Sequence, residues 1–108
     1  MSMTVVITRN VAPRIRGFLA SCMQEIAPGV YTAPKMSRGV RDRIWSVCQD
    51  WFYALDEQSS IVTTWEDGSL AGGQGVRVLG LPPREIIDHE GMLLTRVRPT
   101  EITGEQCD

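Results

Sequence analysis

Three arginines lie within eight residues near the start of the chain, around a proline that suits the first turn of a helix. Arg9, Arg14 and Arg16 flank Pro13, and an apolar run at residues 3–8 precedes them. The start of a helix presents unpaired backbone N–H groups and the positive end of the helix dipole, and both attract anions. Guanidinium groups form fork-like hydrogen bonds with phosphate. The segment therefore predicts a phosphate-binding corner.

Basic side chains are concentrated in the first 43 residues, which hold seven basic and two acidic residues, whereas the remainder holds four basic and eleven acidic residues. This asymmetry favours a surface for nucleic acid or another polyanion, even though the net charge is −2. The alternative left open is that the arginines only solubilise exposed helix faces. The candidate DNA-binding residues are Arg14, Arg16, Arg84, Arg38, Arg41 and Asn10.

Catalytic chemistry has little support in the sequence. His89 is the single histidine, and its neighbours Asp88 and Glu90 would point to the opposite face of a strand, so we interpret the segment as a polar turn. The glycines at residues 72–75 fit a hairpin connection. We find no nucleophile motif, no phosphate-cradling loop and no cysteine spacing typical of zinc or a disulfide framework. The sequence predicts no catalytic residue and no metal site.

Apolar residues recur at intervals of three and four over residues 13–26 and 37–55, which predicts two amphipathic helices. Ser37 can cap the second helix. Trp45 and Tyr53 fall partly off its apolar stripe and are candidates for contact with another subunit. The expected core residues are Ile15, Phe18, Leu19, Cys22, Met23 and Ile26 in the first helix, and Val40, Ile44, Val47, Cys48, Trp51 and Leu55 in the second.

Runs rich in β-branched residues predict strands at residues 3–8, 30–32, 61–65 and 76–79, with a turn at Ala33-Pro34 and a hairpin connection at 67–75. A last extended unit covers 85–88 and 92–97. This order predicts an α+β fold in which an antiparallel sheet carries both helices on one face. The strands are apolar on both sides, so we expect a second copy to cover the other face in a two-fold symmetric homodimer.

The length of 108 residues bounds the chain to one domain. We assign residues 1–99 to this domain and residues 100–108 to a polar tail. No apolar run approaches the roughly 20 residues that a membrane-spanning helix needs, and the N-terminus does not resemble a secretion signal. We therefore expect a cytoplasmic protein.

Four segments together resemble one protein family. They are residues 3–19, Gly29-Val30-Tyr31, Ile44-Trp45 and residues 88–92, and the combined pattern is similar to the small CRISPR-associated adaptation protein of the I-E subtype. Its family is described as the CRISPR-associated endoribonuclease family, and the likeness covers nearly all of residues 1–99. The resemblance implies a ferredoxin-like fold and a symmetric homodimer. It also implies a place between two dimers of the CRISPR integrase, where the protein helps hold the DNA duplex that becomes a new spacer.

The resemblance also implies roles for particular residues. It assigns Arg14 and Arg16 to contacts with the duplex backbone, and Arg84 to a second contact site. Family members often carry two adjacent basic residues at that second site, where this chain has Pro83 before Arg84. The segment at about residues 85–97 corresponds to the part that docks on the integrase.

One departure from the family concerns cleavage. Members credited with metal-dependent nuclease activity carry an acid at the end of the first strand, where this chain has Thr8-Arg9-Asn10. Magnesium requires oxygen ligands, and an arginine supplies none. We therefore expect a non-catalytic scaffold that needs no cofactor. Two alternatives stay open: a magnesium-dependent endonuclease of the same family, and a ferredoxin-like interaction module unrelated to CRISPR.

Overall fold

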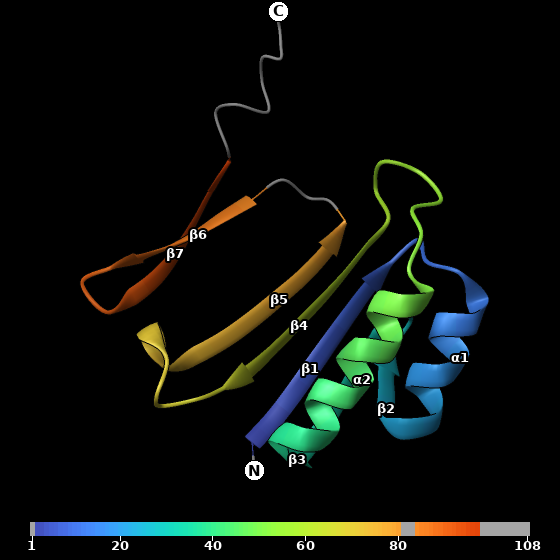
Figure 1. The fold of residues 1–108 in the computed structure, drawn as a ribbon, viewed down its shortest axis with the longest axis horizontal. Helices are drawn as coiled ribbons and strands as arrows, with labels where there is room; N and C mark the ends of the chain where they lie inside the picture. Colours follow the sequence, from blue (N-terminus) through green and yellow to red (C-terminus); the bar gives the residue numbers. More distant parts are fainter. Residues whose placement is uncertain (1, 81–83, 98–108) are drawn as a thin grey trace, which may run out of the picture.

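The computed structural model describes residues 2–80 and 84–97 (Figure 1). The expected tail at residues 100–108 lies outside this range, as does Cys107. The chain forms two helices, a five-stranded sheet and a separate two-stranded hairpin. Its elements are β1 (Ser2–Arg9), α1 (Pro13–Cys22), β2 (Gln24–Ala27), β3 (Val30–Met36), α2 (Arg38–Trp51), β4 (Ser60–Glu66), the 3-10 turn η1 (Ala71–Gly73), β5 (Gln74–Gly80), β6 (Arg84–His89) and β7 (Met92–Val97).

The five strands pair in the order β2-β3-β1-β4-β5, and every neighbouring pair is antiparallel. In each strand–helix–strand unit, a third strand lies between the two strands that the helix joins. The first four strands in this order give the ferredoxin-like arrangement, and β5 extends it as a hairpin partner of β4. The predicted α+β fold is thus confirmed, with both helices on one face of an antiparallel sheet (Figure 1).

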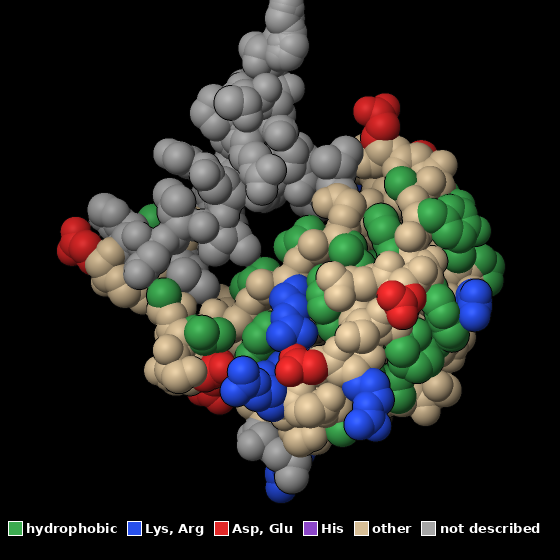
Figure 2. Space-filling model, in the orientation of Figure 1, with side chains coloured by type: hydrophobic (Ala, Val, Ile, Leu, Met, Phe, Trp, Pro, Cys, Tyr) green, Lys and Arg blue, Asp and Glu red, His purple; other side chains and the backbone are tan. Residues whose placement is uncertain are grey.

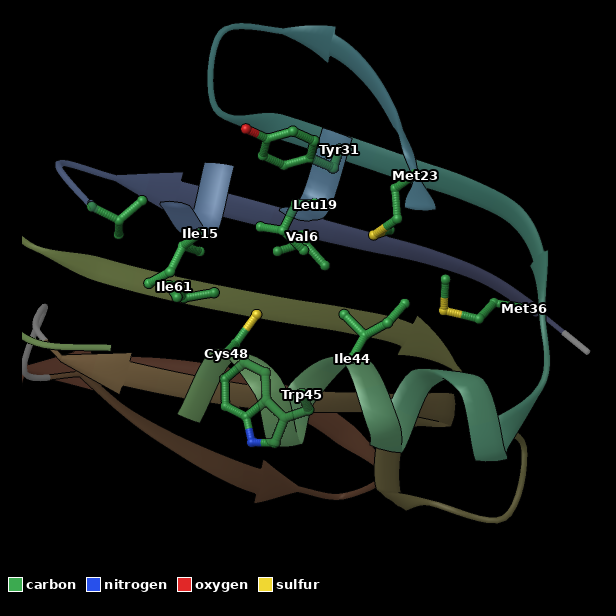
Figure 3. Packing of buried hydrophobic residues seen from close by; sticks show 11 residues of the cluster. Val6, Ile15, Leu19, Met23, Tyr31, Met36, Ile44, Trp45, Cys48 and Ile61 are labelled. Carbon is green, nitrogen blue, oxygen red and sulfur yellow. The ribbon is translucent and has the colours of Figure 1, made fainter. Parts of the chain in front are cut away.

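The core lies between the helices and one face of the sheet (Figure 3). Val6 from β1, Tyr31 from β3 and Ile61 from β4 point toward the helices and are fully or almost fully buried. They meet side chains that recur at helical spacing on α1 and α2, which explains why these two segments fold as amphipathic helices. The helical members of the core are Ile15, Leu19, Ile44, Trp45 and Cys48.

The opposite face of the sheet is also apolar. Met3, Ile7 and Val78 are exposed there, and Val5 and Val62 between them are only partly buried. These residues alternate with the core residues because successive side chains of a strand point to opposite faces. The expected apolar character of both faces is therefore confirmed, and no helix of the described residues covers this second face (Figure 1).

The first helix is shorter than predicted, and a strand was missed. Helix α1 ends at Cys22, because Met23 already has an extended backbone and the chain continues as β2. The apolar spacing that includes Ile26 fits a helix, but pairing of β2 with β3 prevails and leaves Ile26 61% exposed. Cys22 is exposed as well, contrary to expectation, whereas Cys48 is buried, and both are free cysteines.

Other boundaries also differ from the prediction. Pro34 lies inside β3 instead of turning the chain, at a register irregularity between β3 and β1 that tolerates a residue without an N–H group. Ser37 caps α2 as predicted, since its hydroxyl accepts a hydrogen bond from the backbone N–H of Val40 at 3.3 Å. The helix ends at Trp51, four residues early, and Val40 and Leu55 are exposed instead of lying in the core.

The final hairpin matches the prediction closely. His89 pairs with Met92, so the loop has two residues, Glu90 and Gly91, and both have positive φ angles (53° and 84°). This is the backbone of a type I′ turn, which suits the twist of a two-residue hairpin. The segment around His89 is therefore the expected polar turn. None of the described helices has the length and apolar character needed to cross a membrane.

Candidate nucleic-acid interface

The corner between β1 and α1 is open to an anion. Helix α1 starts at Pro13 with Ala12 at the capping position, so no side chain caps the helix, and its first turn contains no acidic residue. The positive end of the helix dipole is therefore not neutralised locally. Ala12 and Val11 are buried and anchor the corner to the core, whereas Arg14 and Arg16 are exposed.

Arg14 lies against an aromatic side chain from the other helix. Its guanidinium carbon is 3.7 Å from the centre of the Trp51 ring, a close cation–π contact. Phe18 meets the same ring edge-on, with ring centres 5.5 Å apart and an interplanar angle of 67°. Trp51 was predicted as a core residue but is only half-buried. No sequence pattern predicts its contact with Arg14, because the two residues lie on different helices.

Arg16 has a different environment. Its Nη2 atom lies 3.9 Å from Oε2 of Glu25, and both side chains are partly exposed. The same carboxylate oxygen accepts a hydrogen bond from the backbone N–H of Gly29 at 3.0 Å, so it belongs mainly to the turn between β2 and β3. An exposed pair at this distance contributes little and leaves the guanidinium free to form other contacts.

Asn10 takes part in a local structural network. It has a positive φ of 49°, which asparagine tolerates better than most residues, and its carbonyl accepts a hydrogen bond from the Ser59 hydroxyl at 2.7 Å. A hydrogen bond from the Asn10 side chain is the main cause that lowers the pKa of the Asp56 carboxyl. Asp56 also accepts a hydrogen bond from the backbone N–H of Gln58 at 2.7 Å. Sequence reasoning missed this link between the end of β1 and the loop before β4.

Arg84 is the first residue of β6, and its backbone pairs with Val97; its side chain lies outside the described residues. Gly80 at the end of β5 pairs with Ser60, which in turn pairs with Arg9. Strand β5 therefore ends at the same end of the sheet as β1. Because four residue steps span at most about 14 Å, Arg84 begins near the same end of the sheet as the arginine corner.

A second basic group lies at the start of α2. Arg41 is only 7% exposed, and its guanidinium carbon is 4.2 Å from the centre of the Trp65 ring. Burial lowers the pKa of Arg41. Arg77 approaches the same ring at 5.0 Å and donates a hydrogen bond to Asp42 at 2.8 Å, which lowers the pKa of that carboxyl. Arg41 and Arg77 are therefore held by contacts within the folded chain.

Arg38 is the exposed member of the second group. Its side chain is 87% exposed, and its Nε atom lies 4.0 Å from a carboxylate oxygen of Asp42. A shallow hollow of about 470 Å³ adjoins Arg38 and Arg41, but Glu66 and Asp67 line it as well. The acids offset the arginines there, so this end of α2 is less selective for anions than the start of α1.

The two helix starts do not converge within one chain. Arg14 contacts the last residue of α2, whereas Arg38 is the first residue of that helix, and 14 helical residues span about 21 Å. On the face shown in Figure 2, lysine and arginine side chains are spread in small groups and form no continuous stripe. The candidate site is therefore the corner at the start of α1, with Arg38 as a separate contact.

A carboxylate cluster for a metal is not found in this region. Among residues 2–80 and 84–97, as far as they are described, no three His, Cys, Asp or Glu side chains are grouped so that they could hold a metal ion. At the end of β1, the carboxylate of Asp56 is already hydrogen-bonded to Asn10. These ligands do not fit a magnesium ion, which favours several free carboxylate oxygens.

Comparison with known protein families gives a match over most of the chain. The family model described as CRISPR-associated protein (Cas_Cas2CT1978) matches residues 3–94 of the chain. The matched segment runs from β1 into β7 and includes the arginine corner, both helices and Arg84.

Proposed function

The chain belongs to this family of CRISPR-associated proteins, and we propose that it is a non-catalytic scaffold, of subtype I-E, in the complex that integrates new spacers. In this role, a homodimer binds the backbone of the spacer-precursor DNA duplex and bridges two dimers of the integrase in the cytoplasm. The observation that carries the proposal is the uncapped start of α1 with Arg14 and Arg16 exposed beside it.

The geometry of the corner suits backbone phosphates more than base edges. Arg14 and Arg16 are two residues apart in the first turns of α1, so they flank the helix start on different sides, with Arg14 toward Trp51 of α2 and Arg16 toward Glu25 of β2. Contacts of this kind give affinity and position without reading sequence. Arg84 starts β6 at the same end of the sheet and is the proposed third contact, while Arg38 at the far end of α2 is an outlying one.

The end of β1 supports binding without cleavage. Arg9 and Asn10 stand where a nuclease of this type would place an acid, and Asn10 is engaged with Asp56. In the part of the chain that the structure describes, no group of three carboxylate, histidine or cysteine side chains is placed to hold a magnesium ion. In the proposed mechanism the chain only holds the duplex and sets the distance between the two integrase copies.

Two apolar surfaces support the proposed partners. The sheet face that carries Met3, Ile7 and Val78 suits a second copy of the chain, because it is apolar and lacks a helix cover. The β6–β7 hairpin is a two-stranded unit with Met92 and Leu94 exposed, and such a unit has marginal stability by itself. We assign residues 85–97 to integrase docking on this basis and on the family resemblance.

The test uses the full chain assembled with the CRISPR integrase of the same host and a labelled DNA duplex. The double variant Arg14→Ala/Arg16→Ala should weaken duplex binding roughly tenfold or more at moderate salt, because each lost charged hydrogen bond contributes about 1.5–3 kcal/mol. The slope of log affinity against log salt should also fall, by about one for each phosphate contact removed. Arg43→Ala, which removes one exposed charge from α2, is the matched control. Unchanged binding by the double variant would refute the proposed site.

The nuclease alternative has one observation in its favour, the carboxylate of Asp56 beside Asn10. Incubating the purified chain with magnesium and with RNA or duplex DNA tests it, and we expect no cleavage. Cleavage that a chelator abolishes and that Asp56→Asn removes would establish the alternative. Absence of any salt-dependent DNA binding, together with no affinity for integrase, would instead point to an interaction module outside CRISPR.

A further inference from the structure

We propose that Trp51 is a positioning residue for Arg14: the indole ring at the end of α2 holds the guanidinium group of α1 ready for a backbone phosphate. The inference rests on the proposed function, because it names what prepares the main DNA contact. Neither residue would lie near the other without the packing of α1 against α2.

The ring is fixed before any ligand arrives. Phe18 packs edge-on against Trp51, and both aromatic residues are half-buried against the core. The packing of the two helices thus determines the position of the indole face that Arg14 covers. At 3.7 Å from the ring centre, the guanidinium carbon is in van der Waals contact with that face, well inside the range of about 6 Å for cation–π attraction.

Contact with the ring face leaves the donors of Arg14 available. The five N–H groups of a guanidinium lie in its plane and point outward from its edges, so a ring against its face takes none of them. The side chain remains exposed to solvent. A phosphate can therefore approach the edge of a cation whose direction is already set.

Preorganisation matters because an exposed arginine has many rotamers to lose on binding. Arg14 has given up part of this freedom in the folded chain, where a ring face holds its guanidinium, whereas the Arg16 guanidinium lies beside the carboxylate of Glu25 and the hydroxyl of Tyr31, and both of these compete for its donors. The same charge at two neighbouring positions should then contribute unequally, with Arg14 giving the larger share.

A simpler reading is that the contact only braces α1 against α2. Both readings predict some loss of folding stability when the ring is removed. They differ in DNA binding, because a brace acts whatever residue occupies position 14, whereas a positioning residue acts only through the Arg14 side chain. A double-mutant cycle separates the two.

The cycle compares the unaltered chain, Trp51→Leu, Arg14→Ala and the double variant, each assembled with integrase and titrated with a labelled duplex at several salt concentrations. Trp51→Leu should weaken binding about two- to fivefold, the size expected of an exposed cation–π contact. It should leave the salt slope unchanged, since the charge of Arg14 remains. In the Arg14→Ala background, Trp51→Leu should have no further effect. Trp51→Phe, which keeps a ring face, should restore most of the affinity.

Each result decides between the readings. If Arg14→Ala leaves binding unchanged, the proposed DNA site fails and the inference fails with it. If Arg14→Ala weakens binding but Trp51→Leu does not, the site stands and the inference is overturned. If Trp51→Leu weakens DNA binding equally in the unaltered chain and in the Arg14→Ala variant, the ring only braces the two helices, and the inference is again overturned. Urea unfolding of every variant accompanies the titrations, and Trp51→Met replaces Trp51→Leu if the leucine variant does not fold.

Discussion

Two arginine–tryptophan contacts lie at opposite ends of α2, and they differ in burial far more than in distance. Arg14 lies 3.7 Å from the Trp51 ring at the end of the helix, where the arginine is exposed and the ring is half-buried. Arg41 lies 4.2 Å from the Trp65 ring near the start of the helix, where both side chains are more than nine-tenths buried. The same kind of contact, an arginine against a tryptophan ring, thus occurs once near the surface and once in the interior.

The difference shows that surroundings decide what such a pair does. Arg41 is surrounded by the fold, and among the described residues its Nε atom and the nearby Thr4 hydroxyl have no hydrogen-bond partner. Attraction to the ring and to the carboxylates of Asp42 and Asp67 compensates the burial of this cation, so the contact contributes to stability. Arg14 keeps its hydration and its donors, so its contact is free to serve binding.

The largest expected effect is the difference in folding stability lost when each of the two tryptophan rings is removed. Trp65→Ala should lower the free energy of unfolding by about 3–5 kcal/mol, since it leaves a cavity and an uncovered arginine. Trp51→Ala should cost roughly 1–2 kcal/mol, because half of the ring already faces solvent. Urea unfolding of both variants at one protein concentration measures the difference. Equal losses would remove the distinction between a buried and an exposed contact.

Two glycines test the same distinction with a single methyl group. A Cβ atom at Gly75 would overlap the Trp65 ring, so Gly75→Ala should destabilise the protein by about 1–3 kcal/mol. Gly17 in α1 has nothing within 4 Å of such an atom, and Gly17→Ala should stabilise it by about 0.4–1 kcal/mol. Thermal or urea unfolding provides the measurement. A stabilising Gly75→Ala would mean that the Trp65 ring is loosely held.

The smallest effect is a dependence on pH of the ion pair between Arg77 and Asp42, which lies beside the buried Trp65 ring but is itself partly exposed. The hydrogen bond from Arg77 lowers the pKa of Asp42 below its ordinary value of 3.8, so the carboxylate stabilises the fold at neutral pH. This contribution is lost as the pH falls below about 4 and through the folded-state pKa. The stability difference between the unaltered chain and Asp42→Asn should therefore shrink from pH 7 toward pH 3.

The exposed pair supplies the control for that measurement. A contact between an arginine and a tryptophan contains no carboxyl group, so the stability difference caused by Arg14→Gln should stay constant over this range. Urea titrations at several pH values give both curves. A difference for Asp42→Asn that does not change with pH would mean that the bond to Arg77 is absent in solution.

Local patterns in the sequence predicted much of the fold. The proline and the arginines that start α1, the Ser37 cap and the Glu90-Gly91 turn act through neighbouring residues, and each was found where expected. Strand β2 was missed because the spacing of Met23 and Ile26 also fits a helix. Only pairing with β3, a contact made through the tertiary fold, decides between the two.

The candidate site was predictable in part for the same reason. Arg14 and Arg16 could be identified from the sequence because a helix start attracts anions wherever it lies. The assignments of the tryptophans were wrong in part: Trp45 is in the core instead of being available to another subunit, and Trp51 packs against the core but is only half-buried, beside Arg14. Apolar periodicity places a residue on a helix face, but it does not tell how far the neighbouring helix covers that face.

The apolar sheet face that carries Met3, Ile7 and Val78 has a consequence for abundance. With that face shared by two copies, as proposed, folding and association become one reaction, and mass action governs both. Each tenfold dilution then lowers the free energy of unfolding per dimer by about 1.4 kcal/mol. A cell that makes little of this protein would hold it nearer to its unfolding threshold, so expression level becomes one of the quantities that determine how much folded scaffold exists.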